Sequence, residues 1–490
     1  MSKINIEFRD GIYEVDKDIS MISFYDSIKN NINENPLVGS INNKVVSLNE
    51  KVSKDCRIDF YDINTPIGNK AYERGISFIF IKAVRDVLNC DVKIEHSLDK
   101  GIYCEILHNF EVDEIIVEKI KIRMREIVAL SLSIDKILVS RIDAIDYYNK
   151  SKQYEKAKSL KYISNTSVSL YKLDNILDYF YGEVPINTKY MTEFDIKLIK
   201  DNCVILLYPR LYKADENLKY EHHMKLFEEF RSYSKWARIL NITTISDLNE
   251  LSSKSKYNDI IRISEVTQNN KLFNLVNEIS EDIKVILITG PSSSGKTTIS
   301  KKLAMFLESK GMEPFYISID DYFINRKDTP VGEDGKPDYE SINAIDKELF
   351  SKQINSLLNN EEVCLPTYNF IKGEKEFSKT CIKLSEKSIL IIEGLHAFNE
   401  ELTRGVSKKV KYNIYLSPLT VLNIDNHNRI TTTDNRLIRR MVRDNMTRGY
   451  NVSKTLSNWQ KVRAGEEKYV FPYQDMADVV FNTSLLYELS

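Results

Sequence analysis

The nine residues from Gly290 to Thr298, GPSSSGKTT, constrain the fold of this chain more than any other stretch. They match the pattern G-x-x-x-x-G-K-[ST], which in proteins lies between a β-strand and an α-helix. The flanking sequence has this form, because residues 283–289 are an apolar, β-rich run and residues 299–310 carry apolar side chains at helical spacing. A chance match would lack this context. We therefore expect an α/β domain with a parallel sheet and a phosphate-binding loop.

Each part of this loop has a chemical role in binding a nucleoside triphosphate. The glycines let backbone N–H groups turn toward a phosphate, and the following helix adds unpaired N–H donors and its dipole. Lys296 supplies a cation for the β- and γ-phosphates, and the hydroxyl of Thr297 is a ligand for Mg²⁺. ATP and Mg²⁺ are thus the expected cofactors. The ATP-binding residues that the motif predicts are Gly290, Ser292, Ser293, Ser294, Gly295, Lys296, Thr297 and Thr298.

Length and charge narrow the class of protein. The chain has 490 residues and a net charge of -2. Its length predicts about three domains, and its charge gives no overall attraction to nucleic acid or anionic membrane. The six cysteines form no C-x-x-C pair, which argues against a disulfide framework and a cysteine zinc site. No apolar run approaches the ~20 residues of a membrane span, and no secretory signal begins the chain. We expect a cytoplasmic protein without membrane contact.

Three regions differ in their secondary-structure pattern. Residues 1–63 combine short strands with one helix, and this order predicts a β-grasp-like domain. Residues 64–250 mix amphipathic helices with short strands and predict an α+β domain. A polar stretch of small residues at 252–256 marks the boundary. Residues 260–490 contain the phosphate loop and predict a P-loop NTPase fold with a parallel sheet.

Two further apolar runs in the last region end in carboxylates. Residues 315–319 lead to Asp320, and residues 388–392 lead to Glu393. In open α/β sheets the ligand lies at the carboxyl ends of the strands. Asp320 is therefore placed where it could take the proton of a hydroxyl acceptor, and an aspartate that caps the next turn is the alternative. Glu393 is placed where P-loop proteins keep an acid beside Mg²⁺, as a direct ligand or through water.

A run near the C-terminus, residues 436–449, is rich in arginine. At 100° per residue, four arginines form one stripe of a helix, and four apolar residues take the opposite face. Guanidiniums grouped in this way suit the oxygens of a transferring phosphoryl group. A solvated basic face and a nucleic-acid-binding face are the alternatives, and the phosphate loop in the same domain favours a mobile lid. The stripe consists of Arg436, Arg439, Arg440 and Arg443, with Arg448 just beyond it.

Two loops carry side chains suited to a nucleoside. Glu340, within residues 337–341, could accept hydrogen bonds from a sugar diol. Tyr368, within residues 365–370, could stack on a base or cover a sugar. Each of these signals is weak when it is taken alone.

Together these stretches resemble the uridine kinase and phosphoribulokinase family of P-loop kinases, over about residues 285–480. The resemblance implies that Asp320 is the general base on a nucleoside 5′-hydroxyl, that Lys296 and Arg443 assist catalysis, and that Arg448 contacts ATP. The substrate-binding residues that it implies are Asp320, Tyr322, Glu340, Tyr368 and Arg440. The landmarks occur in the family's order: GPSSSGKTT (290–298), SIDDYF (318–323), PTYNF (366–370), IEGLHA (392–397), RLIRRMVRD (436–444) and FPYQDMADV (471–479).

Two departures from the family pattern concern the substrate. Glu340 stands where uridine kinases carry Asp. Residues 368–372 lack the His that animal uridine–cytidine kinases place near the base. The resemblance therefore implies kinase chemistry more firmly than it implies uridine.

The first 240 or so residues resemble a different group, the TGS domain and second additional domain of threonyl-tRNA synthetases. Residues 70–78 and 236–240 carry this resemblance. In the synthetases the second domain edits mischarged tRNA with metal-binding pairs, the first of which has the form H-x-x-x-H. That pair falls here at Arg74 and Phe78, so the resemblance implies that the editing residues are absent. RNA or tRNA binding, regulation or assembly is the role that remains.

These patterns lead to one main hypothesis, ATP-dependent phosphorylation of the 5′-hydroxyl of a nucleoside such as uridine or cytidine. One alternative is a kinase of another small hydroxyl compound, such as a sugar phosphate or a vitamin precursor. The other alternative is an RNA-binding regulator in which the nucleotide sets the conformation. A nucleoside is the expected partner, with tRNA contact by the N-terminal domains and a homo-oligomer as further expectations.

Overall fold

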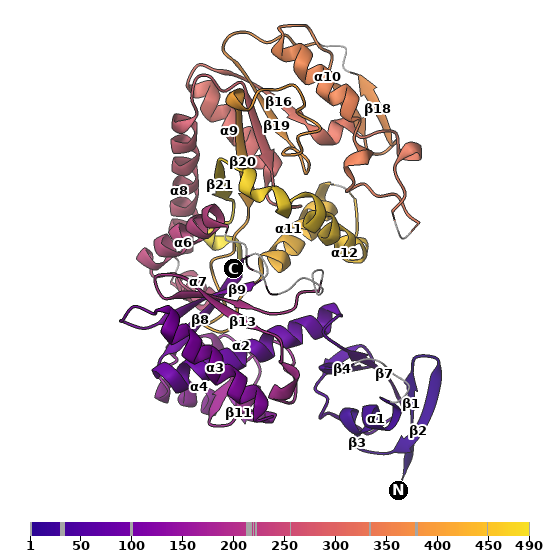
Figure 1. The fold of residues 1–490 in the computed structure, drawn as a ribbon, viewed down its shortest axis with the longest axis vertical. Helices are drawn as coiled ribbons and strands as arrows, with labels where there is room; N and C mark the ends of the chain where they lie inside the picture. Colours follow the sequence, from indigo (N-terminus) through magenta and orange to yellow (C-terminus); the bar gives the residue numbers. More distant parts are fainter. Residues whose placement is uncertain are drawn as a thin grey trace. The chain divides into compact units, whose positions relative to one another are not determined.

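The chain forms two compact units, and both are interrupted in sequence. The first unit consists of Met1–His222, Thr244–Asp247 and Leu422–Ile430, and the second of His223–Thr243, Leu248–Val421 and Thr431–Ser490. Each unit has its own sheets and hydrophobic core (Figure 1). The limits of the three expected domains stay a prediction. The computed structural model describes residues 2–29, 35–98, 101–211, 218, 220, 223–254, 256–332, 335–377, 381–447 and 449–489.

The N-terminal part of the first unit is a mixed sheet with one helix. Buried and exposed residues alternate along β1, which places Ile4, Ile6 and Phe8 on one face, where they pack with Met21 and Phe24 of α1. The strand order is β2-β1-β7-β4-β5, with β1 parallel to β7. The assignment of this region as β-grasp-like or TGS-like stays a prediction. Its elements are β1 (Lys3–Phe8), β2 (Gly11–Asp16), β3 (Ile19–Ser20), α1 (Met21–Ile28), β4 (Val38–Ile41), β5 (Lys44–Val46), β6 (Lys51–Val52) and β7 (Cys56–Tyr61).

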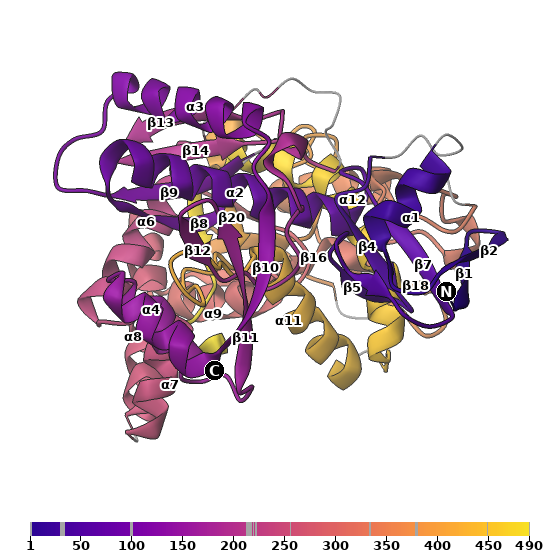
Figure 2. The same ribbon diagram turned by 90° about the horizontal axis from the view of Figure 1, so that it is seen from below.

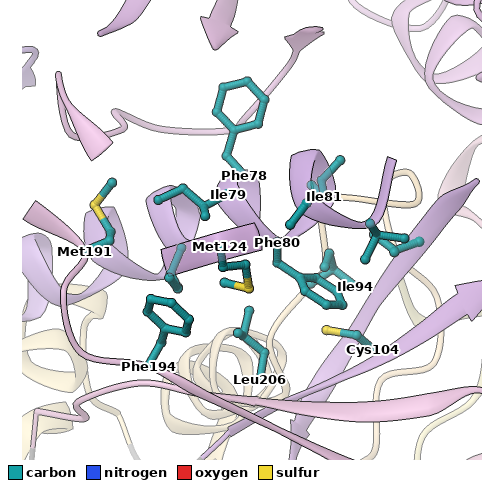
Figure 3. Packing of buried hydrophobic residues seen from close by; sticks show 14 of the residues in the cluster. Phe78, Ile79, Phe80, Ile81, Ile94, Cys104, Met124, Met191, Phe194 and Leu206 are labelled. Atoms are coloured by element: carbon teal, nitrogen blue, oxygen red, sulfur yellow. The ribbon is translucent and has the colours of Figure 1, made fainter. Parts of the chain in front are cut away.

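A four-stranded antiparallel sheet, with the order β13-β14-β9-β8, forms the second core of this unit. Helices α2 and α3 lie side by side and pack against it (Figure 2). Every residue from Gly75 to Val84 of α2 is buried, so this stretch is enclosed on all sides. Figure 3 shows Phe80 of α2 beside Ile94 and Cys104 of the sheet. The elements are α2 (Pro66–Leu88), β8 (Asp91–Leu98), β9 (Gly101–Leu107), α3 (Glu114–Ala129), β13 (Asp195–Lys200) and β14 (Cys203–Leu207).

A smaller antiparallel sheet, β10-β11-β12, packs with two helices in the same unit. Tyr148 of α4 and Leu160 of α5 meet Leu170 of β11 in a separate apolar cluster. The elements are β10 (Ile134–Ser140), α4 (Arg141–Lys150), α5 (Tyr154–Leu160), β11 (Ser167–Leu173) and β12 (Ile176–Asp178).

The second unit is built on a five-stranded parallel sheet with the order β16-β19-β15-β20-β21. The expected parallel sheet is thereby confirmed, and its strand β15 begins two residues after the start of the apolar run. The elements are α6 (Met224–Ile239), α7 (Ile245–Ser253, which begins in the first unit), α8 (Tyr257–Glu278), β15 (Val285–Thr289), α9 (Lys296–Ser309), β16 (Glu313–Ser318), α10 (Lys347–Leu358), β17 (Pro366–Asn369), β18 (Glu374–Phe377), β19 (Ser388–Glu393), β20 (Lys411–Ser417), α11 (Thr432–Thr447), α12 (Val452–Tyr469) and β21 (Val479–Asn482).

Both faces of this sheet are covered, which explains why its central strands are continuously apolar. Ile286 and Ile288 of β15 face one cluster, which includes residues of α8 and α9. Val285 and Leu287 face the other cluster, which includes Phe350 of α10 (Figure 1). Two covered faces leave the carboxyl ends of the strands as the open edge where polar groups gather.

One disulfide, Cys364–Cys381, was not expected from the sequence. The two cysteines stand on either side of the hairpin formed by β17 and β18, and Val363 pairs with Ile382 next to them. The cysteine spacing could not reveal this pairing, because the hairpin brings together residues that are 17 positions apart. Among the residues that the structure describes, no helix is both long and apolar enough to cross a membrane.

Candidate active site

The loop between β15 and α9 has the backbone that the motif predicts. Gly290 and Gly295 have φ angles of 155° and 87°, and Ser293 adopts a left-handed φ of 59°. A Cβ atom at Gly290 would lie 2.2 Å from the carbonyl oxygen of Leu416, so only glycine fits there. The side-chain oxygens of Ser293 and Ser294 are buried without a hydrogen-bond partner in the described part of the chain. Such orphaned polar atoms are where a ligand can bind.

Lys296, the first residue of α9, lies within this loop. Its Nζ donates to the carbonyl oxygens of Gly290, at 2.9 Å, and Pro291, at 3.3 Å. Burial lowers the pKa of Lys296, and the carboxylates of Glu393 and Asp320 act in the opposite direction by favouring its charged form. Its hydrogen-bond acceptors in the loop are neutral, so its positive charge can still act on a phosphate.

Thr297 and Glu393, the two expected metal ligands, are brought together. The hydroxyl of Thr297 donates to Oε1 of Glu393 at 3.2 Å, and Tyr316 donates to the same oxygen at 2.6 Å. Hydroxyl and carboxylate oxygens are the hard ligands that Mg²⁺ prefers. Across the described ranges no cluster of three or more His, Cys, Asp or Glu could hold a metal.

Asp320 follows β16 directly, in a short 3-10 turn that spans Ile319–Tyr322. Its carboxylate raises the pKa of both Lys296 and Glu340, so it lies close enough to act on both. The sequence placed these three residues in one site on the strength of strand ends and resemblance. All three belong to the second unit.

Tyr322 lies elsewhere than the expected substrate site. Its side chain is fully buried, and its hydroxyl donates to Oε1 of Gln353 at 2.8 Å. Its ring meets the edge of Phe350 in the core beneath the turn. Tyr322 therefore supports the turn that carries Asp320, and the arrangement gives it no free group to offer to a substrate.

Tyr368 forms an aromatic group beside the same turn. Its ring packs edge-on against Phe323, at 5.7 Å between centroids, and against Phe370, at 5.1 Å. Its backbone N–H donates to the carboxylate of Asp321 at 3.1 Å, which ties β17 to the residue after Asp320. Tyr368 is 6% exposed and Phe370 is 56% exposed, so the apolar surface that this group offers belongs to Phe370 and not to the predicted Tyr368.

Glu340 has a strongly perturbed carboxyl group. Burial raises the pKa of Glu340 to about 7. The positive charge of Arg440 lowers this pKa, whereas the negative charges of Glu466 and Asp320 raise it. Its backbone carbonyl accepts a hydrogen bond from Nε2 of His396 at 2.9 Å. A perturbed carboxyl among other charged groups is a common mark of a functional site.

The arginine stripe lies on a helix, α11, as expected, but its faces are reversed relative to an ordinary surface helix. Arg436 is 1% exposed, whereas Ile438 and Val442 on the opposite face are 50% and 54% exposed. The solvated basic face considered from the sequence is therefore wrong. Carbonyl and carboxylate oxygens near the phosphate loop hold the arginines inward. Arg448 lies outside the described residues.

Two of these arginines contact the loop directly. Nη1 of Arg440 donates to the hydroxyl of Ser292 at 2.6 Å, and Nη1 of Arg439 donates to the carbonyl oxygen of Ser293 at 3.3 Å. Asp444, which is 2% exposed at its side chain, holds Arg440 at 3.3 Å and Arg443 at 2.8 Å. Asp444 was not singled out from the sequence, although its place one residue after Arg443 was a usable signal.

Glu466 of α12 is a further residue that sequence reasoning missed. Its Oε1 accepts the backbone N–H of Ser292 at 2.7 Å and a hydrogen bond from Arg436. Its Oε2 accepts from Arg463 at 3.0 Å. Nothing in the sequence distinguishes it from its neighbour Glu467, because its partner in the loop is 174 positions away.

The first unit carries one cysteine and one histidine at the C-x-x-x-H spacing of a synthetase editing pair, Cys104 and His108. Cys104 is fully buried in β9, and its thiol donates to the carbonyl oxygen of Ile102. Nδ1 of His108 accepts the backbone N–H of Phe110. The described residues contain no group of three or more His, Cys, Asp or Glu that could hold a metal at this pair.

The comparisons with known proteins concern the region around the phosphate loop. The model of the phosphoribulokinase / uridine kinase family matches residues 285–486. A uridine kinase of Borrelia duttonii (strain Ly) is 29% identical over 217 residues, which cover 42% of this chain and 93% of that protein. A uridine kinase of Ligilactobacillus salivarius (strain UCC118) is 27% identical over 197 residues, which cover 40% and 83%.

Among solved structures, the chain is similar to a possible uridine kinase from Bacillus stearothermophilus, with 19% identity and a TM-score of 0.31, over 44% of this chain and 98% of that one. The C-terminal part of the chain therefore contains a domain of the phosphoribulokinase / uridine kinase family, on the strength of the family match. These findings support a kinase of a nucleoside or another small molecule.

Proposed function

We propose that the second unit is an ATP-dependent kinase that phosphorylates the 5′-hydroxyl of a nucleoside, with uridine and cytidine as the preferred acceptors. The observation that carries this proposal is the phosphate loop itself, with Lys296 bound to its carbonyl oxygens and the Thr297–Glu393 pair beside it. The similarity to uridine kinases supports the choice of acceptor.

The roles of the residues follow from the chemistry of phosphoryl transfer, which needs positioning and charge stabilisation above all. Asp320 accepts the proton of the attacking hydroxyl. Lys296 and the arginines Arg440 and Arg443 offset the charge that develops on the transferred group. Thr297 and Glu393 are the residues that would hold Mg²⁺, which when bound neutralises charge on the phosphates.

The acceptor side of the site rests on Glu340 and the aromatic group around Tyr368. A carboxyl group can accept hydrogen bonds from a sugar diol, and an aromatic surface can cover a base or a sugar. Glu340 is longer by one methylene than the Asp that uridine kinases carry at this place. This departure favours a second candidate, a kinase of another small hydroxyl compound such as a sugar phosphate or vitamin precursor.

A coupled assay of ADP release over nucleosides, sugar phosphates and vitamin precursors tests the proposal. We expect uridine and cytidine to give kcat/KM values at least tenfold above those of the other compounds. Preferential turnover of a sugar phosphate would support the second candidate. Release of ADP with none of these acceptors, together with RNA binding by residues 1–250, would support a nucleotide-responsive regulator instead.

Further expectations stay proposals. They include the TGS-like and synthetase-like nature of residues 1–63 and 64–250, contact with RNA or tRNA through these regions, a homo-oligomeric state and a cytoplasmic location. The proposal of nucleoside kinase activity is argued without any of them.

A further inference from the structure

We infer that Glu466 is a positioning residue of the kinase site, which fixes the phosphate loop through Ser292 and thereby sets the affinity for ATP. This inference rests on the proposed function in so far as it concerns turnover. Its structural basis is a carboxylate with no exposed surface that is surrounded by donors from three different segments. These donors belong to the phosphate loop, to α11 and to α12 itself.

Ser292 is bound at each of its polar atoms. Its backbone N–H donates to Glu466 at 2.7 Å, and its carbonyl oxygen accepts from Nε of Arg436 at 2.9 Å. Its hydroxyl accepts from Arg440 at 2.6 Å. A residue held at its N–H, its carbonyl and its side chain has one conformation, so the loop is fixed where it turns from β15 toward α9. The N–H groups that follow Ser292 are then pre-organised for phosphate.

The charges around Glu466 explain how a carboxylate is tolerated next to an anion-binding loop. Arg436 and Arg463 both bind it, and Arg436 also lies over the ring of Trp459 at 5.5 Å. Arg463 is shared with Glu467, so two guanidiniums and two carboxylates meet here and their charges offset each other. The charge of Glu466 also favours the protonated form of Lys296. Loss of this carboxylate would leave two guanidiniums without their shared partner.

The neighbouring Glu467 provides a matched control. It lies on the same helix and pairs with the same Arg463, at 3.0 Å, but it has no contact with the phosphate loop among the bonds that the structure describes. We therefore compare Glu466→Gln with Glu467→Gln in the full chain. The readouts are the Kd for ATP, measured by calorimetry, the KM for ATP, the KM for the acceptor and the melting temperature.

We expect Glu466→Gln to weaken ATP binding at least tenfold and to raise the KM for ATP, while the KM for the acceptor stays within twofold. Glu467→Gln should stay within twofold in all three. Unchanged or tighter ATP binding in Glu466→Gln overturns the inference. If Glu466→Gln does not fold, Glu466→Asp keeps the charge and shortens the reach, and the same outcomes apply to it. Calorimetry needs no acceptor, so a failed nucleoside kinase assay leaves this test intact.

A separate observation carries a second inference, which concerns the segment Leu422–Ile430. This segment belongs to the first unit, although the residues before and after it belong to the second. Only Thr431 separates it from α11, which carries the inward-facing arginines. We propose that the first unit anchors the base of α11 through this segment and so controls the arginine helix.

The anchoring contacts lie within the first unit. Nδ2 of Asn423 donates to the carbonyl oxygen of Ile94 at 2.8 Å. The two ring nitrogens of His427 meet Asp178 at 2.6 Å and Asp91 at 3.0 Å. The last anchored side chain, Arg429, binds Oε1 of Glu73 on α2 at 2.6 Å. Because Arg429 stands three residues before α11, a shift of α2 at Glu73 is passed along the backbone to the helix.

Glu73→Gln tests this anchor, because it keeps the shape of the side chain and removes the charge that binds Arg429. The matched control is Asp195→Asn, which removes an ion pair with Lys121 in the same unit, at 2.8 Å, without touching the segment. The readout is amide hydrogen exchange of α11 in the full chain, together with kcat.

We expect exchange in α11 to become at least fivefold faster and kcat to fall at least fivefold in Glu73→Gln, with neither change in Asp195→Asn. Exchange in α11 equal to that of the control overturns the second inference. If Glu73→Gln is unstable, Arg429→Gln removes the same pair from the other side and is judged by the same outcomes. Hydrogen exchange is read without an acceptor, so it is independent of the proposed activity.

Discussion

Two buried networks of charged side chains differ in how completely they are paired. In the first unit, His427 stands between Asp91 and Asp178, and Lys156 also binds Asp178. Arg429 binds Glu73 and helps to hold the pKa of this carboxyl at about 2, against the effect of burial. Each of these charges meets an opposite charge or a hydrogen-bonding partner. Such a network holds chain segments in place.

The network at the phosphate loop is incomplete in comparison. The hydroxyls of Ser293 and Ser294 have no partner within the described part of the chain, and Lys296 donates to the backbone carbonyls of Gly290 and Pro291. Glu340 keeps a pKa of about 7 because burial and like charges outweigh its attraction to Arg440. The difference teaches that buried charge alone does not indicate function. Buried polar groups without a hydrogen-bonding or charged partner are a better indication of a ligand site.

The largest effect on activity is expected when the positive charge of Lys296 is removed from the phosphate loop. Lys296→Ala should lower kcat by a factor of about 10³ or more, because no other group replaces the charge next to the phosphates. Lys301→Ala is the control, since Lys301 is exposed on the same helix, α9. The measurement is steady-state ADP release. Activity in Lys296→Ala equal to that in the control would contradict the assigned role.

Asp320→Asn should sharply reduce phosphoryl transfer while leaving ATP binding intact. We expect kcat to fall by about 10²–10⁴, the range typical of a lost general base, while ATP binding stays within twofold. Asp321→Asn serves as the control, because an amide oxygen can still accept the hydrogen bond from Tyr368. Calorimetry with ATP and a coupled kinase assay check both parts. Full turnover in Asp320→Asn would exclude it as the base.

A change in the fully paired charge network of the first unit should alter stability and not catalytic activity. Lys156→Met leaves the buried carboxylate of Asp178 without its ammonium partner, which costs about 3 kcal/mol when one member of a buried pair is removed. For a unit of this size we expect the melting temperature to fall by about 6–12 °C. Scanning calorimetry on the full chain, with Lys150→Met as an exposed control on α4, measures it. An unchanged transition would show that this pair carries no stability.

The smallest effect concerns Glu340 and depends on pH. Its pKa in the folded protein is raised to about 7 from an ordinary 4.5, so ionisation between these values costs stability as the pH rises. Glu340→Gln removes that cost and should raise the melting temperature at pH 8, with little change at pH 4. Melting curves at both pH values test this. A gain of equal size at both values would contradict the raised pKa.

The sequence predicted those parts of the fold and site that depend on local pattern. The strands β15 and β19 were visible as apolar runs because both faces of the sheet are covered. The phosphate loop followed from its motif, and Asp320 and Glu393 followed from the strand ends. Helix α11 was predicted as a helix, and the alternative of a solvated basic face was wrong, because an amphipathic pattern by itself does not show which face is buried.

The parts that were missed depend on contacts between distant positions. Glu466 binds a residue 174 positions earlier, and Arg429 binds one 356 positions earlier. Tyr322 was placed at the substrate by the resemblance to the kinase family, whereas its side chain packs in the core. Periodicity describes which face of an element is buried, but it does not describe what lies against that face.

The interruption of both units in sequence has a consequence for dissecting the protein. A fragment beginning at residue 260 would contain Leu422–Ile430 but none of the residues of the first unit that enclose it. His427 would lose both aspartates, and an apolar and charged stretch would be left to solvent between β20 and α11. A truncation at the sequence boundary therefore removes part of a folded unit. The catalytic region is best expressed and studied in the full chain.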